Sequence, residues 1–252
     1  MKKVAFISAA GWKRSGDEHG LADCPEPLLP LGDGTTSLYR TARVLSALDF
    51  DVYIAMAPIG YRFDQHWAMF TEDQPLLEGS PWTQERVDYV SKLGTVIHVP
   101  NPGRTCGAHS TFCEMMEVVT DWDHLFLARG DMVYSEGHLA RIITTLPWPS
   151  QYQVAPTHGW LLLDKSIEAA YLSQVAPFHH TTWESRKIWS TTTYQLPDGY
   201  PQGTHKFGLK VFNNQNGPVG QWLDIDNVKT YKQALAGVAD GTFAWEEPND
   251  GS

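Results

Sequence analysis

KVAFISAAGWKRSG, residues 3–16, joins a short apolar run to a glycine turn that carries two basic residues. The run at residues 3–8 contains Val, Phe and Ile, which favours a buried strand. Small residues directly after a strand let backbone N–H groups approach phosphate oxygens, and Lys13 and Arg14 add positive charge against a triphosphate. The stretch therefore predicts an α/β domain that binds a nucleotide. Any surface turn can have a similar composition, and the GxxxxGK[ST] motif is absent.

Strand-like and helix-like segments alternate through residues 1–146. This alternation predicts a parallel sheet with right-handed crossovers, which binds ligands beyond the carboxyl ends of its strands. Thr36 or Ser37 is expected to cap the first helix, and the pair Ser80-Pro81 is expected to begin the second. The predicted strands are residues 3–8, 52–57, 96–99 and 125–128, and the predicted helices start near residues 37, 81, 109 and 136 and end near residues 48, 93, 119 and 146.

The second half of the chain is less regular. Strands are expected at residues 151–155, 160–163 and 206–212, and a closing helix at residues 228–239. We interpret residues 58–79 as an insertion and residues 177–203 as a substrate-specific lid. The chain is predicted to be one domain, 1–252, with a nucleotide-binding half at 1–146 and an acceptor-binding and metal-binding half at 147–252.

Composition excludes several classes of protein. Hydrophobic residues make up 42% of the 252 residues and charged residues 19%, as in an ordinary globular domain. The formal net charge of −10 disfavours non-specific nucleic-acid binding. No run approaches the ~20 apolar residues of a membrane span, and the cysteines Cys24, Cys106 and Cys113 form no CxxC pair. We therefore expect a cytoplasmic protein without a membrane partner, and a homo-oligomer stays open.

Two later patches carry carboxylates. Asp131 follows a predicted strand in LARGD, residues 127–131, while Asp224 and Asp226 lie in QWLDIDN, residues 221–227. Asp224 and Asp226 share one face if this segment is a strand, and two carboxylates on one face are costly without a cation. Mg²⁺ suits such a site because it combines one or two carboxylates with phosphate oxygens. We expect Mg²⁺ at Asp131, Asp224 and Asp226. Alternatively, Asp131 lies in an ordinary turn, and Asp226 or Asn227 only caps the final helix.

These patches, in this order, resemble the nucleotidyltransferase family with the glycosyltransferase-A-like fold. The family includes sugar-phosphate nucleotidylyltransferases, small cytidylyltransferases and molybdenum-cofactor guanylyltransferases. The matching segments are AAGWKR at 9–14, PEPLLPLG at 25–32, GAHS at 107–110, GDM at 130–132 and the segment 222–231. The resemblance touches most of the chain but is sparse at 58–92 and 147–205. It implies a three-layer α/β/α fold with a mostly parallel, Rossmann-like central sheet, plus an irregular substrate-binding region in the second half.

The chain departs from the family pattern at two positions. Lys13 stands where the family has the second glycine of GxGxR, and Glu26 stands where it has the lysine of P-K-P. In relatives that lysine contacts the nucleotide phosphates, whereas a glutamate repels them by about 1 kcal/mol at close range even in water. Either Lys13 replaces the missing charge or Glu26 faces away. The match therefore supports the fold more strongly than it supports catalysis.

The resemblance implies transfer of NMP from an NTP to a phosphorylated small molecule, with release of pyrophosphate. Arg14 and Lys13 would be catalytic residues that bind the β- and γ-phosphates. The implied partners are an NTP, a small-molecule acceptor and Mg²⁺. The nucleotide would be bound by Ala9, Ala10, Gly11, Gly107, Ala108 and Ser110, and the acceptor by Arg104, Lys206 and Lys210.

Two other functions remain open at this level. Asp224-Ile225-Asp226 has the DxD form with which glycosyltransferases hold the diphosphate of a nucleotide-sugar donor, although it lies near the C-terminus rather than in mid-chain. The second alternative is a nucleotide-binding module that has lost catalysis, for which Glu26 is the best support.

Overall fold

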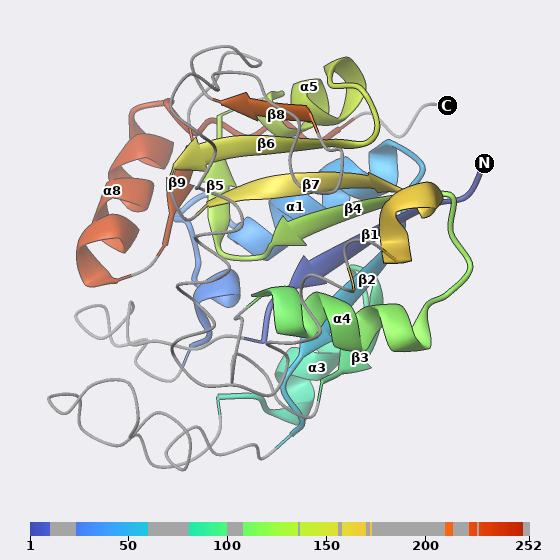
Figure 1. Cartoon of the computed structure of the whole chain (residues 1–252). Coiled ribbons are helices and arrows are strands. Elements are labelled where there is room, and N and C mark those ends of the chain that lie inside the picture. Colours follow the sequence, from blue (N-terminus) through green and yellow to red (C-terminus); the bar gives the residue numbers. More distant parts are fainter. Residues whose placement is uncertain are drawn as a thin grey trace, which may run out of the picture.

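The chain folds around a mixed sheet with helices on both faces (Figure 1). The computed structural model describes residues 1–10, 24–59, 81–99, 108–135, 137–155, 158–169, 172, 210–213, 222–225 and 227–248. The sheet is built from β1 Lys3–Ser8, β2 Asp51–Met56, β3 Thr95–His98, β4 His124–Arg129, β6 Ser150–Ala155, β7 His158–Asp164 and β8 Lys210–Asn213. These seven strands lie in the order β3-β2-β1-β4-β7-β6-β8.

The first four strands of the chain form the parallel part of the sheet. Strand β1 pairs in parallel with β2 and β4, and β2 pairs in parallel with β3. Strand β7 is antiparallel to β4 and β6, while β8 returns parallel to β6. Because the first four strands run in the same direction, their carboxyl ends meet at one edge, where ligands bind in such sheets.

Strand β1 is buried on both faces because its alternate side chains enter two separate cores. Ala5 and Ile7 belong to one core, and Val4 and Phe6 belong to the other. The second core is covered by α4 (Ala108–Val118), which Figure 1 shows in front of the sheet. The first core is covered by α1 (Ser37–Ala47), α3 (Gln84–Val90), α5 (His138–Thr145) and α8 (Val228–Ala239). This arrangement confirms the predicted three-layer α/β/α class with a mostly parallel sheet.

Helices α1 and α8 begin where side-chain caps were expected. The Thr36 side chain accepts a hydrogen bond from the Tyr39 amide, which identifies Thr36 as the cap of α1. The cap of α8 is Asn227, which accepts from the Thr230 amide within a capping box. Thus Asn227, one of the two residues considered for this role, is the residue that caps α8.

The predicted start of the second helix was wrong. Helix α3 begins at Gln84, and its cap is Thr83, whose hydroxyl accepts from the Arg86 amide at 3.4 Å. The chain before the helix instead buries Trp82, which is 1% exposed. Burial of a large aromatic ring outweighs the local preference of proline for a first helical turn.

A second, two-stranded sheet was not predicted. Strand β5 (Met132–Tyr134) pairs antiparallel with β9 (Trp222–Asp224), and Met132 stands opposite Asp224. Three-residue strands are too short for a period-two pattern to be recognised in the sequence. This small sheet brings the end of the first half of the chain beside the segment that precedes α8.

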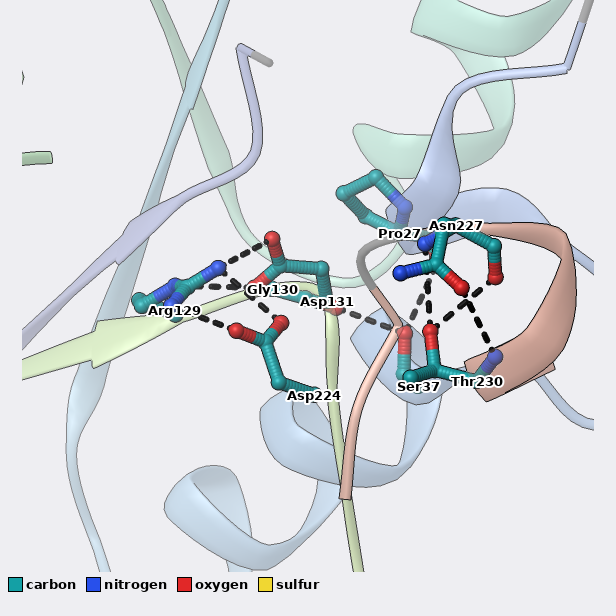
Figure 2. Close-up of polar contacts among 8 residues, drawn as sticks. All are labelled: Pro27, Ser37, Arg129, Gly130, Asp131, Asp224, Asn227 and Thr230. Carbon is teal, nitrogen blue, oxygen red and sulfur yellow. Dashed lines mark hydrogen bonds and ion pairs between the residues drawn. The ribbon is translucent and has the colours of Figure 1, made fainter. Parts of the chain in front are cut away.

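Gly130 contacts three other segments of the chain, namely the end of β1, the short helix η2 (Glu26–Leu28) and the start of α1, and we call this point the joint. Its amide donates to the Ser8 carbonyl at 2.9 Å, and its carbonyl accepts from the Ser37 hydroxyl at 2.7 Å (Figure 2). A Cβ at this position would lie 3.2 Å from the Ala9 Cβ and 3.3 Å from that of Pro27, which follows Glu26 in η2. A side chain here would push its neighbours by a few tenths of an ångström, so close packing favours glycine at this position.

The insertion expected at residues 58–79 lies outside the described residues except for residues 58 and 59, and the lid expected at residues 177–203 lies outside them entirely. None of the helices in the described ranges combines the length and the hydropathy that a membrane crossing requires.

Replacing Ser37 tests the joint at Gly130. Ser37→Ala removes the hydroxyl that donates to the Gly130 carbonyl, so the free energy of unfolding should fall by ~1–2 kcal/mol in urea denaturation. Ser46→Ala is the matched control because Ser46 is exposed on the same helix, and its effect should stay within ~0.5 kcal/mol. Equal losses in the two variants would contradict a structural role for this hydrogen bond.

Candidate functional site

Asp131 and Asp224 are brought together by the backbone. Asp131 follows Gly130 in the turn between β4 and β5, and its carbonyl accepts from the Ile225 amide at 3.0 Å. Asp224 ends β9 opposite Met132, the residue after Asp131. The two aspartates therefore flank a pair of hydrogen-bonded strands at the carboxyl edge of the parallel sheet. The structure thus brings together two of the three carboxylates that we considered as metal ligands.

The guanidinium of Arg129, the last residue of β4, lies between the two carboxylates (Figure 2). Its Nε and Nη2 donate to the two oxygens of Asp131 at 3.1 and 2.7 Å. Its Nη1 and Nη2 donate to the two oxygens of Asp224 at 2.9 and 3.0 Å. Each of the four carboxylate oxygens thus accepts a charge-assisted hydrogen bond from one side chain, with Nη2 shared between the two acids.

This group of charges is largely withdrawn from water. The side chains of Arg129, Asp131 and Asp224 are 23%, 17% and 10% exposed. Burial of the guanidinium works against its charge, but the carboxylates of Asp131 and Asp224 outweigh burial and raise the pKa of Arg129 above its ordinary value. Arg129 therefore remains a cation throughout the physiological range.

Glu26 belongs to the same electrostatic environment. The residue is 2% exposed, and its negative charge also acts to raise the pKa of Arg129. The glutamate that replaces the family lysine is therefore turned into the protein, and solvent does not screen its charge. A phosphate brought to this edge would meet three carboxylates and one guanidinium, a net charge of −2 if all four are ionised.

The two aspartates are suitable ligands for Mg²⁺ by their chemistry, but the charge of Arg129 in the observed position opposes binding of the ion. Magnesium requires its oxygen ligands at about 2.1 Å, and all four oxygens here already accept N–H groups. A dication ~4 Å from the guanidinium would be repelled by ~2 kcal/mol even in water. Among the described residues no group of three or more His, Cys, Asp or Glu side chains is arranged to hold a metal. Mg²⁺ and Arg129 therefore compete for these oxygens.

Ala9 and Ala10 lie where the sequence predicted, directly after β1, and both are 1% exposed. The Ala9 amide donates to the Ala55 carbonyl at 3.0 Å, so the sheet already uses this N–H group. Amides further along the turn would have to meet a phosphate. Gly11, Lys13 and Arg14 lie outside the described residues.

The remaining predicted site residues are only partly described. Ala108 and Ser110 lie in the first turn of α4, which follows β3 and so begins at the carboxyl edge of the sheet. Lys210 begins β8, the outermost strand of the sheet, which lies three strands away from β4. The residues that fall outside the described part of the chain are Arg104, Gly107, Lys206 and Asp226.

Arg129 is the site residue that sequence reasoning missed. A signal for it was present, because it is the only charged residue of the apolar stretch 125–129 and precedes Asp131 by two positions. Residues two apart in extended chain point to the same side, so an Arg-x-Asp sequence at a strand end can form an ion pair. That Arg129 also pairs with Asp224 could not be read from this spacing.

Comparison with known proteins identifies the fold. No family model matches the sequence, and no curated protein matches it. An inositol-1-phosphate CTP transferase from T. maritima superposes with a TM-score of 0.55 and 13% identity, over 95% of this chain and 97% of that chain. A putative glucose-1-phosphate thymidylyltransferase from Bacillus anthracis gives 0.54 and 12%, over 94% and 96% of the two chains. A UDP-glucose pyrophosphorylase from Acinetobacter baumannii gives 0.53 and 12%, over 96% of each. The chain therefore has the α/β fold of these nucleotidyltransferases, as its motifs predicted.

Proposed function

We propose that the protein is a nucleotidyltransferase that transfers NMP from an NTP to a phosphorylated small molecule. The observation that carries the proposal is the convergence of Asp131 and Asp224 beside Gly130, at the edge of the sheet where ligands bind in this type of fold. Carboxylates in this position favour a ligand whose phosphates bring their own cation. The named reactions of the structurally similar proteins support the same class of substrate.

In the proposed reaction an acceptor phosphate oxygen attacks the α-phosphorus in line, the bond to the β-phosphate breaks, and pyrophosphate leaves. Such chemistry depends on positioning and charge neutralisation more than on a protein nucleophile. The nucleotide would lie over residues 1–146, with Lys13 and Arg14 at the β- and γ-phosphates and residues 107–110 beside the base. The acceptor would bind within 147–252, where Lys206 and Lys210 are the candidates, together with Arg104 from the first half.

We retain Mg²⁺ as part of the proposal, held by Asp131 and Asp224 once Arg129 has moved from them. The ion would supply positive charge that neutralises the phosphates as the leaving group departs. Arg129, once released, has the planar fork of donors that matches a phosphate. Asp226 would add a third carboxylate from the same segment.

Nucleotide binding can be tested by thermal unfolding with ATP, CTP, GTP, UTP and TTP, each with Mg²⁺. A ligand at about 100 times its Kd stabilises a protein by ~2.7 kcal/mol, which is several degrees in a chain of this length. We expect at least one NTP to raise Tm by ~5 °C or more, whereas inorganic phosphate at the same concentration should not. The proposal would be wrong if no NTP raised Tm.

Catalysis can be tested by pyrophosphate release with the NTP that binds and a panel of sugar 1-phosphates and inositol 1-phosphate. Asp131→Ala and Asp224→Ala should each lower the rate at least ~100-fold. Each variant lacks a carboxylate that would hold the Mg²⁺ whose charge stabilises the leaving pyrophosphate. Asp121→Ala is the matched control: Asp121 is 89% exposed and pairs with Lys2, the residue before β1, at the opposite edge of the sheet. Circular dichroism would establish that each variant is folded, and full activity in both site variants would refute their assigned roles.

A second candidate function is nucleotide binding without turnover. It is favoured by the four hydrogen bonds that Arg129 already makes to the two aspartates and by the burial of Glu26. The two experiments separate the candidates, because a pure binding module shows the rise in Tm but releases no pyrophosphate with any acceptor in the panel.

A further inference from the structure

Arg129 makes the two-aspartate site complete without any ligand. One guanidinium supplies a hydrogen bond to every oxygen of Asp131 and Asp224, at 2.7–3.1 Å. The guanidinium places a positive charge beside the two carboxylates, a role that a bound metal dication would otherwise fill. The pair therefore needs no metal in order to exist at this buried position.

The fold fixes the backbone position from which the Arg129 side chain reaches the carboxylates. Its backbone is the last pair of the β1–β4 ladder, opposite Ser8. The next residue, Gly130, is held by the Ser8 carbonyl and the Ser37 hydroxyl. Asp224 is held by β5 on the other side. These contacts fix the backbone on both sides, so the Arg129 side chain starts beside the two carboxylates.

We propose that Arg129 is the resident cation of this site, and that a divalent metal reaches Asp131 and Asp224 only when the Arg129 side chain leaves them. Arg129 and a metal ion compete for the four oxygens, because a cation bound to them would lie close to the guanidinium and be repelled by its charge. In the free protein the aspartates are therefore poor metal ligands despite their proximity.

The ligand that would draw Arg129 away is a phosphate, because a guanidinium pairs with phosphate oxygens through the same fork that it uses for carboxylates. Resting on the proposed function, this gives a coupled exchange: Arg129 moves to the phosphates of the nucleotide, and the metal that accompanies the nucleotide moves to the aspartates. Metal and nucleotide then bind together more tightly than either binds alone.

The direct test is Mn²⁺ binding to the full chain without nucleotide, measured from the electron paramagnetic resonance signal of free Mn²⁺. Arg129→Met should bind Mn²⁺ at least ~10-fold more tightly than the wild type. Adding Asp224→Asn to Arg129→Met should abolish this gain. Arg43→Met is the control. Arg43 lies on helix α1 and pairs with Glu247, so its replacement changes the net charge by the same amount. Its Mn²⁺ affinity should match that of the wild type.

A second variant keeps the test valid if Arg129→Met does not fold. Arg129→Lys retains the charge, but an ammonium has three donors and no planar fork, so it cannot bond to all four oxygens. Its Mn²⁺ affinity should lie between those of the wild type and Arg129→Met. Equal Mn²⁺ affinities in the wild type and in the folded Arg129 variants would overturn the proposal, whether all bind tightly or none binds.

The exchange with nucleotide has its own readout. In the wild type the rise in Tm with Mn²⁺ and NTP together should exceed the sum of the two separate rises, whereas Arg129→Met should already respond to Mn²⁺ alone. A purely additive response in the wild type would overturn the exchange. If no NTP changes Tm in any variant, the proposed function fails, while the comparison of Mn²⁺ affinities still decides the role of Arg129.

Discussion

The joint at Gly130 is the constraint on which the site depends. A single residue without a side chain lets the end of β4 approach β1, while its two backbone groups bond to Ser8 and Ser37. Any Cβ there would press on Ala9 and Pro27. The same close approach sets where Arg129 and Asp131 lie, because they are its two neighbours in the chain. The close packing at Gly130 therefore also determines where the charged residues of the site lie.

The electrostatics of the edge follow from this packing. Once Asp131 and Asp224 are held within hydrogen-bonding reach of the same guanidinium and largely withdrawn from water, their mutual repulsion favours a cation beside them. The chain supplies that cation as Arg129, whose pKa is in turn raised by the two carboxylates. The resulting cluster explains how a site with acidic ligands can be part of a stable protein before any ligand binds. Glu26, which is 2% exposed, belongs to the same environment and also acts to raise the pKa of Arg129.

Much of the fold was predictable because it is encoded in short-range patterns. The apolar run of β1, the cap at Thr36 with Leu38 and Leu45 on the buried face of α1, and the strand before Asp131 all depend on residues within a few positions of one another. The prediction failed where burial competed with a local signal, as at Trp82, and where the elements were too short to show a period, as in β5 and β9.

The sequence by itself determined the α/β class, the ends of most helices and the position of an acidic residue, Asp131, just after a strand. Only the tertiary structure decided that Asp131 and Asp224 meet, and that Arg129 lies between them. The reason is that periodicity and capping report on neighbours along the chain, whereas the partners of a guanidinium depend on where a segment 95 residues away returns. The role of a charged side chain such as Arg129 therefore depends on which other charges the fold places around it.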